Sequence, residues 1–258
     1  MASIELIIEN NIAFITLNRP DKLNSFNREM ALLLQEKLDE CAASEAVRCI
    51  YITGAGKGFC AGQDLAEVVD PNGPGMQKIL SEHYNPIVTR LRSIPKPIVA
   101  AVNGVAAGAG ANIALACDVV VSSTSASFIQ AFSKIGLIPD SGGTFSLPRL
   151  IGFQRASALM MLGDKVSAAD ALQMGMLYKV FDDAVFAEES KKLALTLSQM
   201  PTQALGYIKQ ALNQTAVNDL PAQLQLEDEY QQKAAATADF KEGVQAFLEK
   251  RAPVYSGK

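Results

Sequence analysis

The feature that most constrains this chain is an uncharged stretch that spans residues 97–117. Its length would suit a membrane-spanning helix. However, the stretch consists mostly of alanine and glycine, and Asn103-Gly104 interrupts it with a turn signal. We therefore predict a buried strand, a turn and a buried helix, in a soluble protein that has no membrane partner.

Short apolar runs alternate with helical periodicity around this stretch. Strands are predicted at residues 4–8, 12–17, 49–53, 98–102 and 119–122, the first two joined as a hairpin across Asn10-Asn11. Helices are predicted at residues 28–41 and 76–91, the second with a kink at Pro86. Strands separated by helices of this length imply right-handed crossovers and a largely parallel sheet in an α/β fold.

Beyond Gly152 the pattern becomes mainly helical. Helices are predicted at residues 155–162, 168–174, 186–200, 203–214 and 220–249, and a single strand at 178–181. We predict an α/β core over residues 1–200. A helical region over residues 201–258 is predicted to pack on this core or on another subunit.

The composition of the 258 residues excludes several classes of protein. It is 49% hydrophobic and 19% charged, which is typical of a globular chain. The net charge of -4 gives no electrostatic reason to expect nucleic acid as a partner. The chain starts without the basic segment of a signal peptide, and its four cysteines stand singly, which predicts reduced thiols in the cytoplasm. No group of potential ligands has the spacing of a metal site, so no metal is predicted.

Three segments, residues 54–65, 104–112 and 136–144, concentrate glycine beside short polar residues. Neither a phosphate-binding loop nor a dinucleotide fingerprint fits, because Lys57 is followed by glycine and the second segment lacks its third glycine. Glycine and alanine let a backbone approach a ligand, and two such segments could offer two N–H donors to one oxyanion. The alternative is a set of tight packing turns, which the residues alone favour.

Asp140 is a carboxylate in an apolar, glycine-rich setting. It could cap a helix that starts near Ser141, where the helix dipole would lower its pKa. It could instead lie in an apolar pocket, where desolvation raises its pKa toward a value useful for proton transfer. The residue types alone favour the cap. His83, the only histidine, lies on the apolar stripe of its helix and is interpreted as structural.

The same segments belong to a set of ordered blocks along the whole chain. These include TLNRPDKLNS at 16–25, FCAGQDL at 59–65 and EGVQAFLEKR at 242–251. In this the chain resembles the crotonase (enoyl-CoA hydratase/isomerase) superfamily. The resemblance implies a ClpP/crotonase-like spiral of β-β-α units with a C-terminal helical region. It also implies a homotrimer or a hexamer made of two trimers, with the helical region over residues 201–258 as the trimerisation region.

The resemblance assigns roles by position. It implies an oxyanion hole made by the backbone N–H groups of Gln63 and Ala109, which would hold the thioester oxygen of an acyl-CoA. Coenzyme A, as part of the substrate and with no separate cofactor, would be bound by six residues. These are Lys22, Ala61, Asp64 and Leu65, together with Phe247 and Lys250 of a neighbouring subunit.

The departures from the family pattern narrow the expected reaction. Hydratases carry two glutamates at positions that hold Asn112 and Phe132 in this chain, so hydration is disfavoured and both residues are expected to line the acyl pocket. Asp140 stands where some isomerases of the superfamily carry a single acid/base group, and this placement reverses the preference for a cap. Dehalogenases of the superfamily use an acidic residue of this region as a nucleophile, which is a weaker alternative.

The blocks VNGVAAGAGA at 102–111 and AFSKIGLIPD at 131–140 are most similar to a subfamily of bacterial phenylacetate degradation. Its members isomerise ring-1,2-epoxyphenylacetyl-CoA to oxepin-CoA and are associated with shifting a double bond of an acyl-CoA from position 3 to position 2. The resemblance thus implies an isomerase. A Δ3,Δ2-enoyl-CoA isomerase of fatty-acid oxidation and a non-catalytic binding protein of the same fold remain open.

Overall fold

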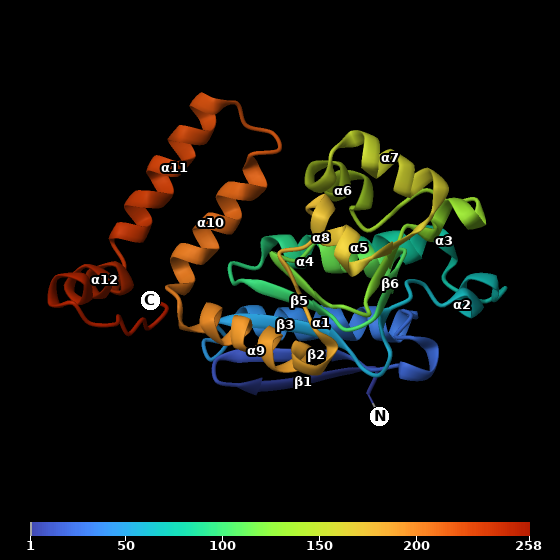
Figure 1. Ribbon diagram of the computed structural model, residues 1–258, viewed down its shortest axis with the longest axis horizontal. Coiled ribbons are helices and arrows are strands. Elements are labelled where there is room, and N and C mark those ends of the chain that lie inside the picture. Colours follow the sequence, from blue (N-terminus) through green and yellow to red (C-terminus); the bar gives the residue numbers. More distant parts are fainter. Residues whose placement is uncertain (1) are drawn as a thin grey trace.

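The computed structural model describes residues 2–258 of the chain (Figure 1). The strands are β1 (Ile4–Glu9), β2 (Ile12–Leu17), β3 (Cys49–Gly54), β4 (Gly58–Cys60), β5 (Ile98–Val102), β6 (Val105–Ala107), β7 (Val119–Ser123), β8 (Ser127–Ile129), β9 (Lys165–Ser167) and β10 (Lys179–Phe181). One sheet has six strands in the order β1-β2-β3-β5-β7-β10, and a second has four in the order β4-β6-β8-β9. In the larger sheet only β1 and β2 pair antiparallel, so the prediction of a largely parallel sheet is confirmed.

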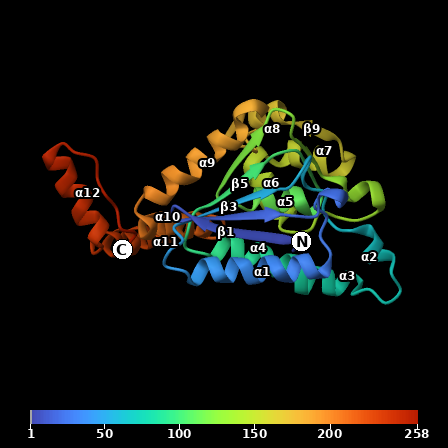
Figure 2. The same ribbon diagram turned by 90° about the horizontal axis from the view of Figure 1, so that it is seen from below.

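The helices up to residue 199 pack around these two sheets, and the later ones extend away from them (Figure 1). They are η1 (Pro20–Lys22), α1 (Arg28–Ala43), α2 (Leu65–Val69), α3 (Gly75–Lys78), η2 (Ile79–Tyr84), α4 (Asn85–Ser93), α5 (Ala109–Leu115), η3 (Ala131–Ile135), α6 (Gly143–Ile151), α7 (Phe153–Leu162), α8 (Ala168–Met174), α9 (Asp183–Gln199), α10 (Thr202–Gln214), α11 (Leu220–Ala235) and α12 (Ala238–Glu249). Figure 2 shows α1 and α4 on one side of the larger sheet and α9 on the other.

The N-terminal hairpin forms as predicted. Asn10 and Asn11 both adopt left-handed backbone, with φ of 51° and 60°. This geometry suits the two-residue turn whose twist matches that of paired strands, and asparagine tolerates it better than most residues. The turn sets the register so that Glu9 lies opposite Ile12 and Ile4 opposite Leu17.

The chain winds as a repeated β-β-α unit. In the pairs β3–β4, β5–β6 and β7–β8, the first strand joins the larger sheet and the second joins the smaller one. Helices follow each pair, which gives the spiral that the resemblance implies. The prediction of a single strand beyond Gly152 was wrong, because β9 pairs antiparallel with β8. All four strands of the smaller sheet have three residues, too few to show an alternating pattern.

The uncharged stretch at 97–117 forms β5, β6 and α5, so its interpretation as a strand, a turn and a buried helix lacked one short strand. All seven residues of α5 are buried. No helix formed by residues 2–258 is both long and apolar enough to cross a membrane.

The central strands of the larger sheet are buried on both faces, and β3 is an example. Ile50 and Ile52 belong to the main core under α1, α4 and α5, whereas Cys49 and Tyr51 belong to a smaller core under α9. Successive side chains of a strand point to opposite faces, which explains the division. The near-continuous apolar run is therefore the pattern of a strand covered on both sides.

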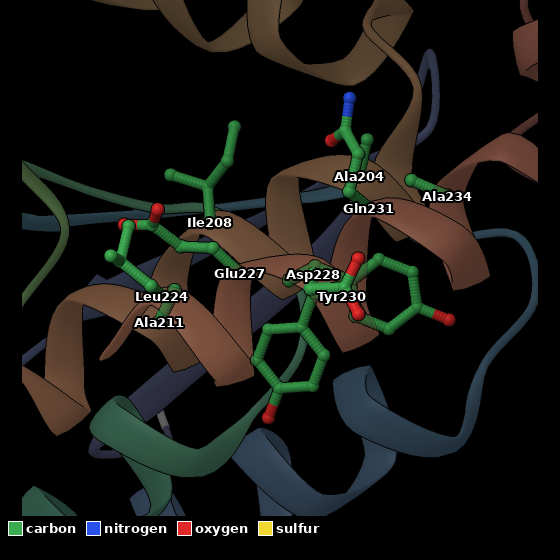
Figure 3. A pocket seen from close by; sticks show the side chains of 10 residues that line it. Ala204, Ile208, Ala211, Leu224, Glu227, Asp228, Tyr230, Gln231 and Ala234 are labelled. Atoms are coloured by element: carbon green, nitrogen blue, oxygen red, sulfur yellow. The ribbon is translucent and has the colours of Figure 1, made fainter. Parts of the chain in front are cut away.

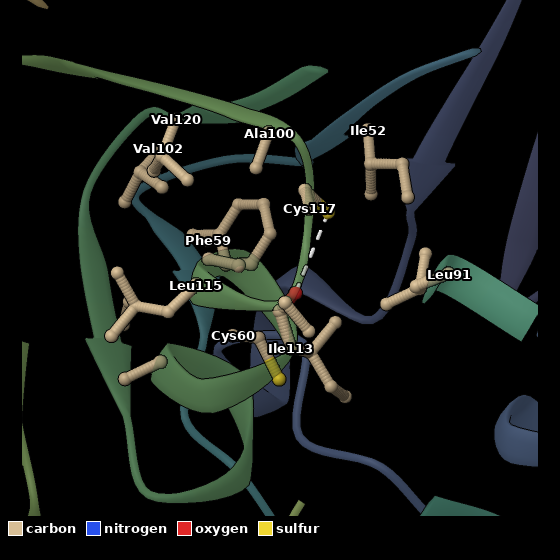
Figure 4. Packing of buried hydrophobic residues seen from close by; sticks show 14 of the residues in the cluster. Ile52, Phe59, Cys60, Leu91, Ala100, Val102, Ile113, Leu115, Cys117 and Val120 are labelled. Carbon is tan, nitrogen blue, oxygen red and sulfur yellow. Dashed lines mark hydrogen bonds between the residues drawn. The ribbon is translucent and has the colours of Figure 1, made fainter. Parts of the chain in front are cut away.

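The main core packs the strands of both sheets against α5 (Figure 4). Phe59 and Cys60 of β4 lie beside Ile113 and Cys117, and the Cys117 thiol donates to the Ile113 carbonyl at 3.4 Å. Burial raises the pKa of the Cys60 and Cys117 thiols to about 12. All four cysteines are free and buried, so they are inert packing residues.

The predicted helix at 76–91 is continuous but changes its winding. α3 passes into the π-helical turn η2 and then into α4, where Pro86 is the second residue. The Asn85 N–H bonds back to the Leu80 carbonyl, five residues earlier. Proline has no N–H to donate, and a π turn relieves the clash its ring would make inside a regular helix. This turn brings His83 and Tyr84 into the core, where both are buried.

The C-terminal helices form an arm that extends away from the sheets (Figure 1). The prediction of one helix over residues 220–249 was wrong. Thr237 separates α11 from α12, because its hydroxyl accepts the Phe240 N–H at 3.1 Å and so caps a new helix. The division of the chain into a core of 1–200 and a trimerisation region of 201–258 stays a prediction, although α10 does begin at Thr202.

Candidate active site

The first two glycine-rich segments lie in contact beside β4 and β6. Gly62 lies at this contact and has a φ of +92°. A Cβ atom on Gly62 would lie 2.9 Å from the Ala107 carbonyl oxygen and 3.4 Å from the Ala109 nitrogen. Only glycine satisfies both the backbone angle and the close approach.

The backbone N–H of Gln63 points away from the neighbouring segment at Phe26. Phe26 donates its N–H to the Gly62 carbonyl at 2.7 Å and accepts the Asp64 N–H at 2.8 Å. Phe26 thus bridges the residues on either side of Gln63, as in a parallel strand pair. Because peptide groups alternate in direction along an extended chain, the N–H of Gln63 points away from Phe26. The preceding residue, Gly62, packs closely on Ala109.

Ala109 is the first residue of α5, and Gly108 precedes it with a φ of 53°. The first N–H groups of a helix have no partner within the helix. Within residues 2–258, neither the Gln63 nor the Ala109 N–H donates to a protein acceptor. Two adjacent free donors are what a developing oxyanion needs.

The Asp140 side chain does not cap a helix, so the interpretation that the residue types alone favoured was wrong. Helix α6 begins at Gly143 with Gly142 as its N-cap. Ser141 and Gly142 both adopt left-handed backbone, with φ of 53° and 74°, and turn the Asp140 side chain away from the helix start. The carboxylate instead accepts the Ser141 hydroxyl at 2.8 Å. Left-handed backbone at a serine is uncommon and is found more often at functional sites.

Burial raises the pKa of Asp140, and the hydrogen bond from Ser141 lowers it, with burial the stronger effect. The net pKa therefore lies above that of an ordinary aspartate. This is the direction that suits a group which takes up and releases a proton. Of the two interpretations that the sequence offered, the desolvated carboxylate with a raised pKa agrees with this burial.

Asn112 ties Asp140 to the helix that begins at Ala109. It is 1% exposed, donates to the Asp140 carbonyl at 2.8 Å and accepts from the Gln130 amide at 2.7 Å. A Cβ at Gly143 would overlap the Asn112 amide, which explains the glycine there. Phe132 is also buried, and its ring would contact a Cβ at Gly108 at 3.7 Å. The two hydratase glutamate positions therefore hold an engaged amide and an aromatic ring.

The comparison that decides the family covers most of the chain. The model of the enoyl-CoA hydratase/isomerase family matches residues 7–258. The chain belongs to this family. The family is enzymatic, and its members act on acyl-CoA substrates and are typically oligomeric. The predicted superfamily and its crotonase-like fold are confirmed.

Individual relatives span the full length. The chain is 50% identical to the 1,2-epoxyphenylacetyl-CoA isomerase of Escherichia coli over 254 residues, which cover 97% of each chain. It is 36% identical to the trans-2-decenoyl-[acyl-carrier-protein] isomerase of Streptococcus mutans, again over 97% of each. Its fold is similar to the crystal structure of an enoyl-CoA hydratase from Bacillus anthracis, with a TM-score of 0.92, 32% identity and coverage of 99% and 100% of the two chains.

Four of the residues predicted to bind coenzyme A lie near one another, in η1, after β4 and at the start of α2. We call this group the coenzyme A edge. Lys22 ends the short helix η1, and the following residue, Leu23, accepts the Ala61 N–H at 2.9 Å. Asp64 caps α2 by accepting the Ala66 N–H at 3.1 Å, and Leu65 is the exposed first residue of α2. The edge thus combines an exposed cation with backbone and apolar surface.

Asp64 is also paired with Arg19 at 2.9 Å. Partial burial raises the pKa of Asp64, but the hydrogen bonds from Arg19 and Ala66 outweigh it and leave the pKa below its usual value. The carboxylate is therefore ionised at neutral pH. It orders the start of α2, and with it the edge that carries Leu65.

Phe247 and Lys250 are not brought to this edge within one chain. Both lie on the C-terminal arm, Phe247 in α12 and Lys250 at its end, whereas α2 lies at the opposite end of the molecule (Figure 1). Phe247 is 82% exposed. A role for these two residues requires a neighbouring subunit and stays a prediction.

His83 has a structural environment. It is fully buried, and its Nε2 lies 3.2 Å from the Arg28 guanidinium, while Nδ1 has no protein partner within residues 2–258. Burial lowers the pKa of His83, so the ring is neutral at physiological pH. No group of three or more His, Cys, Asp or Glu among these residues could hold a metal ion.

A hollow of about 570 Å³ lies away from this site, between α10 and α11 (Figure 3). Ile208, Ala211 and Leu224 form part of its apolar wall, and Tyr207 stacks on Tyr230 at 5.3 Å. None of the predicted site residues lines it. It is a feature of the C-terminal arm.

Sequence reasoning missed three contacts of the site. Ser141 was known only as a neighbour of Asp140, and Tyr84 and Glu67 were not identified. The latter two both hydrogen bond to the Gln63 side chain. Glu67 lies one turn after Gln63, a spacing that could have been noted, but Tyr84 reaches it only because of the π turn.

Proposed function

We propose that the chain is an acyl-CoA isomerase that converts ring-1,2-epoxyphenylacetyl-CoA to oxepin-CoA, as a step of phenylacetate degradation. We further propose that it shifts a double bond of an enoyl-CoA from position 3 to position 2. The relative from E. coli that is 50% identical over nearly the whole chain supports the first activity. The S. mutans isomerase at 36% identity supports the second.

The thioester oxygen would accept the N–H groups of Gln63 and Ala109. Neither donor has a protein acceptor among residues 2–258, and the Gly62 geometry places their segments in contact. As negative charge develops on the oxygen, these two bonds strengthen. Each such donor typically lowers the barrier by about 3–4 kcal/mol.

Asp140 would move the proton. In the double-bond shift it removes a proton from C2 to give an enolate and returns one to C4, so that no water is consumed. In the ring epoxide, opening to the oxepin rearranges ring bonds with no net proton change, and the oxyanion hole orients the ring. Hydration would add water across the double bond. Hydratases of the superfamily do this with two glutamates, whose positions hold Asn112 and Phe132 here.

The observation that carries this proposal is the half-buried carboxylate of Asp140, with its raised pKa. The Asn112 amide, on the helix that begins at Ala109, donates to the backbone carbonyl of Asp140 and so holds the residue beside that helix. One acid/base group beside two oxyanion donors is sufficient for isomerisation.

Substrate binding would involve the neighbouring subunit. Lys22, Ala61, Asp64 and Leu65 would bind coenzyme A, joined by the partner copy's residues equivalent to Phe247 and Lys250. Asn112 and Phe132 would bound the acyl pocket. We propose a cytoplasmic homotrimer or dimer of trimers, with no cofactor beyond the coenzyme A of the substrate. The apolar side chains exposed on the arm support this assembly, among them Ile208, Leu212, Leu224, Phe240 and Phe247.

A Δ3,Δ2-enoyl-CoA isomerase without epoxide activity is the second candidate, favoured by the likeness to the S. mutans enzyme. A panel of ring-1,2-epoxyphenylacetyl-CoA, 3-enoyl-CoA and 2-enoyl-CoA separates the possibilities. The products are separated and identified by chromatography. We expect turnover of the first two substrates and negligible hydration of the third. Turnover of 3-enoyl-CoA alone would favour the second candidate. Dominant hydration, or no turnover of any thioester, would contradict the proposal.

A further inference from the structure

The side chain of Gln63 is held at both ends of its amide. The Tyr84 hydroxyl donates to Gln63 Oε1 at 2.8 Å, and Gln63 Nε2 donates to Glu67 Oε2 at 2.8 Å. The other oxygen of Glu67 accepts the Arg28 N–H at 2.8 Å, which fixes the carboxylate on α1. One amide end therefore meets a donor and the other an acceptor, so the amide has a single favourable orientation.

The tyrosine end of this arrangement is rigid. Tyr84 is 0% exposed, and its ring packs edge-to-face on Phe26 with centroids 6.0 Å apart. Phe26 is the residue whose backbone bridges Gly62 and Asp64. Tyr84 thus contacts the side chain of Gln63 and also the residue that holds the peptides on either side of it.

The tyrosine end of the network is a stable hydrogen-bond donor. Burial raises the pKa of Tyr84 well above its usual value, so the hydroxyl stays protonated and can donate. The two oxygens of Glu67 accept the N–H groups of Arg28 and Gln63. Gln63 itself belongs to no helix or regular strand, so its backbone direction depends on these contacts and on Phe26.

We propose that Tyr84 and Glu67 are positioning residues that fix the direction of the Gln63 backbone N–H by holding the Gln63 side chain. This inference rests on the proposed function, in which that N–H binds the thioester oxygen. It explains why the position carries glutamine when only a backbone N–H is required of it. A shorter side chain would keep the backbone N–H donor but would lose the hydrogen bonds to Tyr84 and Glu67 that fix its direction.

The test uses Tyr84→Phe, which keeps the ring and its packing on Phe26 and removes only the hydroxyl. We expect kcat on 3-enoyl-CoA to fall about tenfold with little change in KM, because the misdirected donor matters most when charge develops. Glu67→Ala, which releases the other end of the amide from a half-buried position, is expected to act in the same way. It also provides a second variant should Tyr84→Phe fold poorly.

Tyr51→Phe is the matched control. Tyr51 is also buried, at 3% exposure, packs edge-to-face on Phe14 and shares a 2.8 Å hydrogen bond with Ser190, but it lies under α9. Its loss should lower the thermal midpoint about as much as Tyr84→Phe does, and leave kcat within twofold of wild type. If kcat fell only because the variant is less stable, it would fall in both Tyr84→Phe and Tyr51→Phe.

A double-mutant cycle with Gln63→Ala completes the test. Alanine keeps the backbone N–H but has no amide to hold, so Tyr84→Phe should cause no further loss of kcat in that background. The proposal is overturned if Tyr84→Phe retains kcat within twofold, if Tyr51→Phe loses as much, or if the tenfold loss persists in Gln63→Ala. Wild-type turnover of the thioester panel tests the proposed function separately, so the two failures are distinguishable.

Discussion

The two free N–H groups of the site are positioned in different ways. Ala109 begins α5, so the helix itself sets the direction of its N–H, and its neighbours need only be small: Gly110 packs directly on Cys60. Gln63 lies in an irregular segment, held by the backbone of Phe26 and by hydrogen bonds to its side chain. A donor at a helix start thus depends on close packing, whereas a donor in an extended segment depends on polar side chains.

This difference decides which substitutions each donor tolerates. Around Ala109, added volume should be harmful and polarity should matter little. Around Gln63, loss of a hydroxyl or carboxylate should matter even when volume is kept. The one residue at which both demands meet is Gly62, next to Gln63 in sequence and against Ala109 in space.

Gly62→Ala should therefore have the largest effect. The new Cβ would press on the Ala107 carbonyl and the Ala109 nitrogen and force the two donors apart. We expect kcat/KM on 3-enoyl-CoA to fall about 100-fold or more, since misplacement of donors at the reacting oxygen is costly. Steady-state kinetics on the folded variant measure this.

Gly175→Ala provides the control for backbone strain. Gly175 has a φ of +91°, and a Cβ there would meet only the Leu150 carbonyl, at 3.3 Å. It should lose about 1 kcal/mol of stability and little activity. Equal losses of activity in both variants would show that strain alone, not displaced donors, accounts for Gly62→Ala.

The second largest loss of activity is the tenfold fall in kcat expected for Tyr84→Phe.

Ser141→Ala should have a smaller, pH-dependent effect on activity. The Ser141 hydroxyl stabilises the ionised form of Asp140, so its removal should raise the pKa of Asp140 further. If Asp140 must be ionised to take the proton, the acidic limb of the kcat/KM profile moves to higher pH. We expect a severalfold loss on that limb and almost none on the plateau. Alanine faces the same left-handed backbone as serine, so strain is unchanged.

Ser93→Ala, on the exposed end of α4, is the matched control and should leave the profile unchanged. A profile for Ser141→Ala that falls uniformly at all pH values would contradict the assignment. It would indicate that Ser141 supports the loop rather than the ionisation of Asp140.

Local patterns predicted much of the fold, and their failures have physical causes. The Asn10-Asn11 turn and the apolar run at 98–102 are strong signals, because each follows from backbone geometry within a few residues. The strands of the smaller sheet are too short to carry a period. The break at Thr237 was missed because a helix that has no buried residue, such as α11, offers little pattern to interrupt.

The site was predictable only in part. The family resemblance supplied Gln63, Ala109 and Asp140, and residue types alone would have assigned packing turns and a helix cap. Tyr84 reaches Gln63 across 21 residues and through a π turn, which no sequence periodicity shows. Asn112 was expected to line the acyl pocket, but its amide is already engaged with Asp140 and Gln130, a partnership visible only in three dimensions.

The pKa shift of Asp140 also predicts how the Asp140→Asn substitution changes the stability of the fold. Because burial raises the pKa of Asp140 in the folded chain, its contribution to stability is fully present below the unfolded-state pKa and is lost as pH rises through the folded-state pKa. At neutral pH the buried carboxylate therefore destabilises the fold. Asp140→Asn should be at least as stable as wild type, so a loss of activity cannot be attributed to unfolding.

The most direct measurement is the turnover of 3-enoyl-CoA by Asp140→Asn, compared with Asp164→Asn, which makes the same change at an exposed position. We expect Asp140→Asn to lose about 10²- to 10⁴-fold in kcat while still binding acyl-CoA, and Asp164→Asn to match wild type. Turnover by Asp140→Asn within a few-fold of wild type would contradict the assignment of Asp140 as the group that moves the proton.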